Sequence, residues 1–186
     1  MPRRTRESPD ASVRSRHTTA ATPARTGSAP PVAAGADVIR QLRCLERGLR
    51  LVSREVEGST TISAAQLFVL EIVARQPATS LAAVAAETHT DRSSVSVVIE
   101  RLVARGLVRR RVSAADRRRS EVHITAAGRR VLARAPTPPT VRLLDAVASL
   151  SAPSRQRLAE GLAQLNDALG FSTARPGLLF EESPGL

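Results

Sequence analysis

Aromatic side chains are nearly absent from this chain: it has no Trp, no Tyr and only three Phe among 186 residues. The core must therefore be aliphatic, and 42% of the residues are hydrophobic, which suffices for a packed domain of ordinary size. Proteins that grip single-stranded nucleic acid stack its bases on several exposed rings. Three Phe cannot form such a surface, so the composition argues against that mode of binding.

Cysteine is represented by Cys44 alone, which excludes an internal disulfide framework and fits a reducing cytoplasm. A redox-sensing thiol needs thiolate character and access to solvent. Arg43 and Arg47 favour a thiolate, whereas Leu42 and Leu45 indicate an apolar neighbourhood. We therefore expect a structural or silent thiol.

Metal- and cofactor-binding patterns are also lacking. The three His, at positions 17, 89 and 123, have no metal-ligand spacing to one another or to the Cys, and the chain has neither a glycine-rich phosphate loop nor a GxSxG motif. No apolar run approaches the roughly 18 residues of a membrane span. We therefore expect a cytoplasmic protein that is not an enzyme and has no cofactor, metal or membrane association.

Lysine is missing as well, so all 28 basic residues are Arg, and the formal net charge is +11. Arginine matches phosphate oxygens and guanine edges with a planar fork of donors. A surplus of this size favours a polyanionic partner. The alternative is a charge that serves solubility only.

Residues 1–36 lack the apolar side chains that a core needs. They hold five of the twelve Pro, and their large aliphatic residues are only Met1, Val13 and Val32. Such a segment cannot bury enough surface to offset its ordering entropy. We predict a disordered basic arm here, which either adds non-specific DNA affinity or is inert, and a patternless C-terminal tail over 171–186.

Between these ends, apolar residues recur at helical spacing in seven segments. The segments are approximately 37–57, 63–76, 80–88, 91–105, 126–135, 140–150 and 154–169. Ser63 and Gln66 form a capping-box pattern, and Asp91 is a good N-cap. Two runs with strand character, 107–112 and 120–125, are joined by a seven-residue loop.

The helix after Asp91 begins with short polar and basic residues: Arg92, Ser93, Ser94 and Ser96. A helix with hydroxyls and Arg in its first turns suits insertion into the major groove of DNA. Arg92 lies at a helix N-terminus, where the macrodipole disfavours a cation. A DNA phosphate would offset this conflict, and Asp91 partly offsets it without DNA.

Two stretches, "LAAVAAETHTDRSSVSVVIERLVARGLVRR" and "DRRRSEVHITAAG", resemble the winged helix-turn-helix of the MarR family of bacterial transcription regulators. The residues that carry the second, more specific match are Asp116, Arg117, Arg118, Ile124, Thr125 and Gly128. The resemblance implies a mainly α fold with a small β-hairpin wing (α+β). It covers a MarR-type domain over 37–170, in which 62–128 form the winged helix-turn-helix DNA-binding lobe.

The resemblance also implies that the first and last helices, 37–57 and 140–169, flank this lobe and pair two subunits. The alternative is that their apolar stripes pack inside one subunit. The "PTPP" motif at 136–139 departs from the long, uninterrupted helix of many family members. It therefore bears on the length and angle of the connection to the dimerisation helices.

By the same resemblance, DNA contacts come from the recognition helix and the wing. The recognition-helix contacts are Arg92, Ser93, Ser94, Ser96, Val97 and Arg101. In the wing, Arg118 reaches the minor groove and Asp116 holds it in place. Arg117 and Arg119 contact phosphates or face solvent, and Val97 either touches a thymine methyl group or is buried. A solvated turn is the alternative reading of the wing.

Together with these features, the resemblance implies a nucleoid-associated, ligand-responsive repressor. It binds double-stranded DNA at a pseudo-palindromic operator as a homodimer and responds to a small-molecule effector. Two alternatives stay open: a non-specific nucleoid-type DNA binder, and a winged-helix protein-interaction module without DNA binding. Residues 90–125 hold nine Arg and four acidic residues, and this positive surplus counts against the interaction module.

Overall fold

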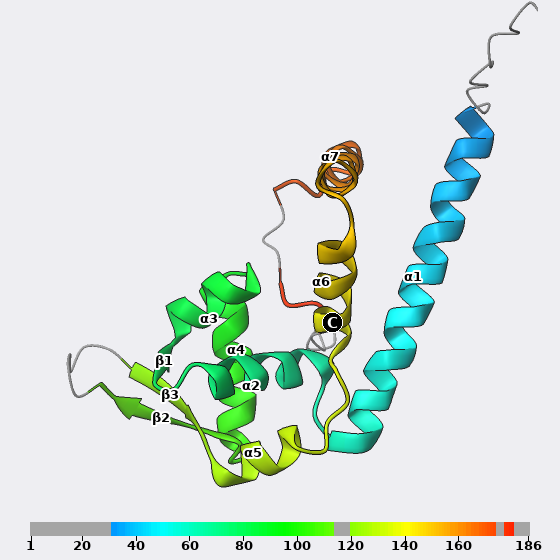
Figure 1. Cartoon of the computed structure of the whole chain (residues 1–186). Coiled ribbons are helices and arrows are strands. Elements are labelled where there is room, and N and C mark those ends of the chain that lie inside the picture. Colours follow the sequence, from blue (N-terminus) through cyan, green and yellow to red (C-terminus); the bar gives the residue numbers. More distant parts are fainter. Residues whose placement is uncertain (1–30, 114–119, 174–176, 181–186) are drawn as a thin grey trace, which may run out of the picture. The chain divides into compact units, whose positions relative to one another are not determined.

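The computed structural model describes residues 31–113, 120–173 and 177–180 (Figure 1). In chain order its elements are α1 (Pro31–Thr60), α2 (Ala64–Arg75), β1 (Thr79–Ser80), α3 (Leu81–Thr88), α4 (Arg92–Ala104), β2 (Val108–Val112), β3 (Ser120–Ile124), α5 (Ala126–Leu132), α6 (Pro139–Ser149) and α7 (Ala152–Ala168). The chain divides into two compact units, 1–39 and 40–186, with the boundary inside α1. The elements confirm the predicted fold class, which is mainly α with a small antiparallel sheet.

Helix α1 starts six residues earlier than the sequence pattern predicts. It begins at Pro31 instead of Asp37, so the predicted arm over 1–36 overlaps the helix. Proline suits a first helical turn because its fixed φ is helical and its missing N–H needs no partner there. The rest of the predicted arm, 1–30, lies outside the described residues.

Helix α2 is the central element of the lobe that α2–α5 and the three strands form, and nine of its twelve residues are buried. A helix that is apolar on nearly every side needs neighbours all round. Its N-terminus has the predicted capping box: Ser63 Oγ accepts from the Gln66 N–H, and Gln66 Oε1 accepts from the Ser63 N–H, both at 3.3 Å. The core around it is aliphatic apart from Phe68.

The sheet has the strand order β1-β3-β2, and both pairings are antiparallel. Val122, in the central strand, pairs with Thr79 on one side and with Arg110 on the other. Strand β1 did not appear in the sequence reading, because two residues are too few to show an alternating pattern. It ties the connection between α2 and α3 to the central strand.

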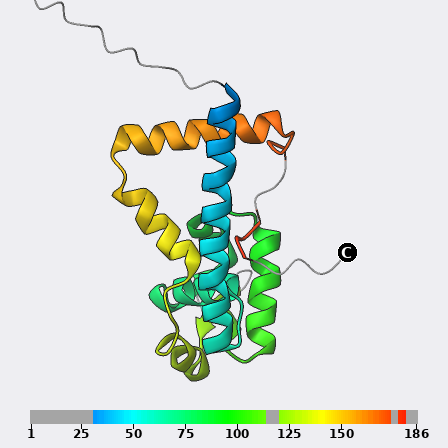
Figure 2. The ribbon, with the colours of Figure 1, turned by 90° about the vertical axis from the view of Figure 1, so that its right-hand side faces the viewer.

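Helices α5, α6 and α7 are separated by two breaks. Helix α5 ends at Leu132, three residues before the predicted end at 135, and residues 133–138, which include most of the "PTPP" motif, are not helical. Pro139 occupies the first turn of α6. Helices α6 and α7 meet at a sharp corner (Figure 2). No residue of α7 is buried, and Leu158 and Leu162 on this helix are 43% and 46% exposed. Within the described residues, the apolar side chains of α7 are therefore left without cover.

The segment 177–180 packs onto the lobe, although the sequence predicts a patternless tail over 171–186. Leu178 is only 8% exposed and belongs to the hydrophobic core, and Phe180 packs against that core. A single buried leucine in a short segment gives no periodic signal, so sequence reasoning could not find this contact. The prediction of a tail without structure is therefore wrong at Leu178.

No single helix among the described residues is long and apolar enough to cross a membrane. Ala34–Thr60 and Ala64–Arg75 together have the length and apolar composition of a span, but the two segments are bent by 69° relative to each other.

Candidate nucleic-acid interface

Helices α3 and α4 form a helix-turn-helix whose turn is His89–Asp91. Ser80 caps α3 by accepting from the Ala83 N–H at 3.1 Å. His89 ends α3 with a φ of 53°, in the left-handed region, and the Thr90 N–H reaches back to the Ala85 carbonyl at 3.1 Å. A left-handed residue reverses the chain between the two helices. His89 is thus a turn residue, which agrees with the absence of any metal-ligand spacing between it and the other His or the Cys in the sequence.

Asp91 is the N-cap of α4 and organises its first turn. Its Oδ1 accepts from the backbone N–H groups of Ser93 at 2.8 Å and Ser94 at 3.1 Å, and also from the Ser93 hydroxyl. Its Oδ2 accepts from the Ser94 hydroxyl at 2.9 Å. These hydrogen bonds hold the pKa of Asp91 well below its usual range. The bond from the Ser93 hydroxyl has the largest effect, followed by those from the backbone N–H and the hydroxyl of Ser94. The carboxylate therefore stays ionised at the N-terminus of α4.

This network changes what Ser93 and Ser94 can offer to DNA. A hydroxyl has one hydrogen to donate and two lone pairs with which to accept. Both hydrogens are donated to Asp91, so each Oγ can only accept further hydrogen bonds; Ser93 is exposed, whereas Ser94 is half-buried. The two serines are hydrogen-bond acceptors at this surface, a restriction that the sequence alone did not indicate.

The two faces of α4 separate as the sequence predicts. The core-facing residues are Val95, Val98, Ile99 and Leu102, and each is fully buried. Arg92, Ser93 and Val97 are exposed on the opposite face, and Val97 is 40% exposed. That exposure decides against the buried alternative for Val97. Arg101 is half-buried.

A polar cluster ties α4 to strand β2. The Ser96 hydroxyl donates to Glu100 Oε1 at 3.0 Å. Arg110 Nη2 lies 3.5 Å from both Glu100 Oε1 and Ser96 Oγ. Ser96 is therefore engaged with the wing strand as well as lying on the helix surface. Sequence reasoning gave Glu100 and Arg110 no part in this interface, because they lie ten residues apart in different elements.

The strands of the wing carry exposed arginines beyond those predicted. Arg109, Arg110 and Arg111 are all exposed on β2, and Arg109 and Arg111 pair with His123 and Glu121 of β3. The basic run "LVRRRV" was the available signal for them. The predicted wing contacts, which are Asp116, Arg117, Arg118 and Arg119, lie outside the described residues.

The start of α5 is locked against the end of α4 by Thr125 and Gly128. The Thr125 hydroxyl donates to the carbonyls of Gly106 at 2.7 Å and Leu107 at 3.0 Å, and accepts from the Gly128 N–H at 3.1 Å. A Cβ at Gly128 would lie 2.3 Å from the Leu107 carbonyl oxygen. Glycine is required here because the two backbones approach so closely. The Thr and Gly of the sequence motif thus have a physical role at the base of the wing.

Comparison with known proteins agrees with this geometry, since residues 60–119 match the model of the MarR family. This segment, about a third of the chain, is MarR-like in sequence. Over 85 residues, or 46% of its length, it is 33% identical to a candidate transcriptional regulatory protein for the hcr operon of Thauera aromatica. The chain spans about half of that relative, 51% of its length.

Two solved structures share the MarR-type fold with this chain. A MepR-like protein complexed with pseudoligands has a TM-score of 0.52 at 22% identity, and the match covers 72% of this chain and 94% of that one. Streptococcus pneumoniae FabT in complex with DNA has a TM-score of 0.50 at 18% identity, with 74% and 97% covered. At these identities the likeness establishes the fold, a winged helix-turn-helix.

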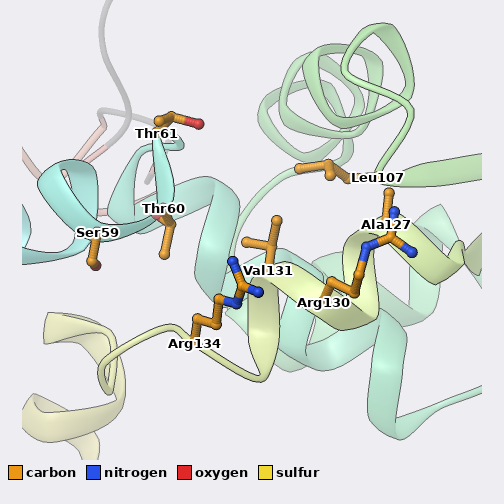
Figure 3. A pocket seen from close by; sticks show the side chains of 8 residues that line it. All are labelled: Ser59, Thr60, Thr61, Leu107, Ala127, Arg130, Val131 and Arg134. Atoms are coloured by element: carbon orange, nitrogen blue, oxygen red, sulfur yellow. The ribbon is translucent and has the colours of Figure 1, made fainter.

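Two cavities of the MarR-type lobe flank α5. The larger, of about 370 Å³, is shown in Figure 3 and is lined by Ser59, Thr60, Thr61, Leu107, Ala127, Arg130, Val131 and Arg134. The smaller, of about 190 Å³, is lined by Val73, Ala74, Pro77, Arg109, His123, Ile124 and Arg129. The adjacent residues Arg129 and Arg130 thus line different cavities. In the part of the chain that the structure describes, no group of three His, Cys, Asp or Glu side chains could hold a metal ion.

Proposed function

We propose that this chain is a DNA-binding transcriptional regulator that inserts α4 into the major groove of double-stranded DNA. The observation that carries the proposal is the exposed face of α4, where Arg92, Ser93 and Val97 stand on a first turn fixed by Asp91. The arginines of β2 add positive charge beside this face, which attracts the phosphate backbone. The match of residues 60–119 to the MarR family model and the DNA complex of the similarly folded FabT support the same function.

The chemistry of the first turn suggests which bases α4 reads. Because the hydroxyls of Ser93 and Ser94 are acceptors, they suit the amino groups of cytosine and adenine in the major groove. Val97, exposed one turn further on, suits contact with a thymine methyl group. Arg92 and Arg101 are proposed to contact phosphates or guanine at the two ends of this surface.

For the wing we propose that Arg118 enters the minor groove and that Asp116 orients it. Arg117 and Arg119 then contact flanking phosphates. The support is the order of motif residues in the sequence together with the antiparallel pairing of β2 and β3, the strands on either side of them in the chain. An arginine in a narrow minor groove reads shape and potential more than sequence.

We further propose a homodimer and a pseudo-palindromic operator. The support is the apolar surface that α1, α6 and α7 leave uncovered, which includes Leu42, Leu45, Leu144, Leu158 and Leu162, each between 38% and 49% exposed. Patches of this kind on a protein surface mark association sites. A dimer would place two recognition helices on half-sites about one helical turn apart. Repression relieved by a small effector is the mode of regulation that we propose.

Genome-wide binding-site sequencing with this chain, followed by isotherms on the recovered site and on scrambled DNA, tests the proposal. A regulator gives a recurring, pseudo-palindromic site that it binds at least a thousandfold more tightly than scrambled DNA. Equal affinity for both DNAs would indicate the non-specific nucleoid-type binder instead. Absence of DNA binding at low salt would indicate the protein-interaction module.

A further inference from the structure

Helix α1 carries a row of arginines that neither the core nor the recognition helix uses. Arg43, Arg47, Arg50 and Arg54 recur at intervals of four, three and four residues, so they line one face of the helix. All four are exposed, and we call them the α1 basic stripe. They border a surface hollow of about 390 Å³. The stripe is therefore an accessible surface and takes no part in the packing of the chain.

The positive charge of the stripe is compensated only in part. Arg50 pairs with Glu46, the only acidic residue between the first and the last member of the stripe. Among the residues that the structure describes, Arg43, Arg47 and Arg54 form no ion pair. Like charges three or four residues apart destabilise a helix. The row therefore does not serve the folding of α1, which indicates a partner outside the chain.

The stripe faces away from the lobe that holds the recognition helix. Val56 of α1 is fully buried and belongs to the same core as α2 and α4. An α-helix turns by about 100° per residue, so Arg47 and Arg54 stand about half a turn round the helix from Val56. Leu42 and Leu45, which belong to the proposed dimer surface, share the side of Val56. The dimer thus leaves the stripe uncovered, and a duplex that lies along the stripe is separate from the one that α4 is proposed to read.

The dimensions and the chemistry of the stripe fit a phosphate backbone. Helix α1 is continuous here (Figure 1), and the stripe extends about 16 Å from Arg43 to Arg54, at about 1.5 Å per residue. A DNA duplex carries one negative charge per about 1.7 Å of its axis, so roughly ten phosphates belong to that length. Arginine binds phosphate oxygens with two parallel donors. Such contacts depend on charge and not on bases, so they carry no sequence preference.

Two other acidic partners fit this surface less well. A helix that lies on a membrane turns its apolar face to the lipid. On α1 the apolar face is opposite the stripe, so the arginines would point away from the bilayer. An interface with an acidic protein needs an apolar core inside its polar rim. Leu51, which is 58% exposed, is the only apolar residue that lines the hollow.

We propose that the α1 basic stripe binds a second DNA duplex through its phosphates, so that one molecule of the regulator bridges two segments of DNA. The first duplex is the one that α4 is proposed to read. The bridging role therefore rests on the proposed function, whereas the binding of DNA to the stripe does not. A dimer carries two stripes and holds the second duplex more firmly than one chain does.

A capture experiment with the full chain tests the bridging. Operator duplex is fixed to beads and loaded with protein, and unbound protein is washed away. Labelled duplex of unrelated sequence is then added at low salt. We expect the loaded beads to retain this second duplex and the beads without protein to release it. Retention should fall steeply as salt is raised, because each neutralised phosphate releases counterions.

Arg43→Gln combined with Arg47→Gln identifies the surface that holds the second duplex. Retention should fall about tenfold, and the slope of log affinity against log salt should fall by about two for each stripe in contact. Operator affinity, measured by anisotropy, should be unchanged. The matched control is Arg155→Gln combined with Arg157→Gln, which removes the same charge from exposed positions of α7 and should leave retention intact. Thermal unfolding should show the stripe variant to be at least as stable as the parent, since it removes like-charge neighbours.

The other outcomes overturn the proposal. Unchanged retention in the stripe variant would place the second duplex elsewhere, and an equal loss in the control would make retention a matter of net charge. Loaded beads that retain no second duplex would make the stripe a solvated face. Flotation with phosphatidylglycerol vesicles, or capture of polyglutamate, that depends on Arg43 and Arg47 when DNA capture does not would identify a membrane or an acidic protein as the partner.

Failure of the proposed function has a different signature. In that case the parent chain shows no preference for any operator, and bridging cannot be measured on beads. Anisotropy with an unrelated duplex at low salt then tests the stripe alone. Binding that is lost in the Arg43→Gln, Arg47→Gln variant would contradict the proposed function and leave DNA binding by the stripe standing. Binding that this variant retains would refute the stripe as well.

Discussion

Gly128 is the residue at which two segments of the lobe come closest. An added Cβ would meet the Leu107 carbonyl oxygen at 2.3 Å and Ile124 Cγ1 at 2.8 Å. We expect Gly128→Ala to lower the free energy of unfolding by about 1–3 kcal/mol, because the backbone must shift to relieve the overlap. Urea unfolding measures this change.

Gly161→Ala is the matched control for that substitution. Gly161 lies inside α7, and nothing lies within 4 Å of a Cβ built there. Alanine in a helix interior is favoured over glycine by about 0.5–1 kcal/mol, so this change should stabilise. If both substitutions changed the free energy of unfolding by the same amount and in the same direction, the close approach at Gly128 would have no energetic consequence.

Asp91 is expected to make the stability of the folded chain depend on pH. Its pKa is lower in the folded chain than the value of about 3.9 for an unperturbed Asp. The stabilisation from its ionised form is therefore complete above that ordinary pKa, and it is lost as the pH falls through the lowered pKa of the folded state. Asp91→Ala should destabilise the chain at pH 7, and the difference from the parent should shrink below about pH 4.

Thermal unfolding of both proteins between pH 3 and 7 checks this expectation. Asp91→Asn is the control, because asparagine also caps helices but does not ionise. Its stability relative to the parent should vary with pH in the same sense as that of Asp91→Ala. A penalty in Asp91→Ala that stayed constant from pH 7 to pH 3 would mean that the charge has no part in the cap.

At the scale of elements, the wing is predicted to act differently from the recognition helix. Arg118→Ala should weaken operator binding by about 1–3 kcal/mol, as single arginine contacts to DNA do. A dimer loses two such charges, so the slope of log affinity against log salt should fall by about two. Ser93→Ala and Val97→Ala should instead change the preferred site with little change in slope, because base-edge contacts release few counterions.

Isotherms at four salt concentrations, on operator and scrambled DNA, measure all these effects. Asp116→Ala should resemble a weaker form of Arg118→Ala, since it frees the arginine without removing its charge. Arg155→Ala, on α7, serves as a control for the loss of one positive charge outside the lobe. Unchanged affinity and slope in Arg118→Ala would make the loop a solvated turn.

The elements also differ in how far the sequence could predict them. Helices α2 to α4 were predictable because their caps, Ser63, Ser80 and Asp91, are local signals followed by periodic apolar residues. Strand β1 and the burial of Leu178 were not, since both depend on partners distant in the sequence.

The same distinction holds for the interface. Which residues of α4 are exposed follows from helical periodicity, and the buried residues Val95, Val98, Ile99 and Leu102 recur at helical spacing as expected. The direction of the serine hydroxyls and the link from Glu100 to Arg110 depend on side-chain geometry between elements. Sequence patterns fix which face a residue occupies, but they do not fix its hydrogen-bond partners.

For the whole molecule, we expect a homodimer at micromolar concentration. Sedimentation should give a species of twice 19.8 kDa, the mass of one chain. Leu158→Glu combined with Leu162→Glu places two charges on the uncovered surface of α7 and should yield monomers. Leu179→Glu, at an equally exposed leucine outside α7, should leave the dimer intact. A parent chain that stays monomeric at tens of micromolar would contradict the proposal.

The burial of Leu178 has a consequence for the birth of the protein on the ribosome. The lobe's last helix, α5, ends at Leu132, yet its core lacks a side chain until residue 178 has been added, 46 residues later. At about 5–20 residues per second, translation takes roughly 2–9 s to cover that distance. During this interval the core of the nascent lobe lacks Leu178, and the apolar side chains that Leu178 later covers are exposed. The neighbouring Gly177 lies near the first turn of α4, because a Cβ built on it would be 3.9 Å from Ser94 Oγ. The DNA-reading surface is thus among the last parts of the molecule to be finished.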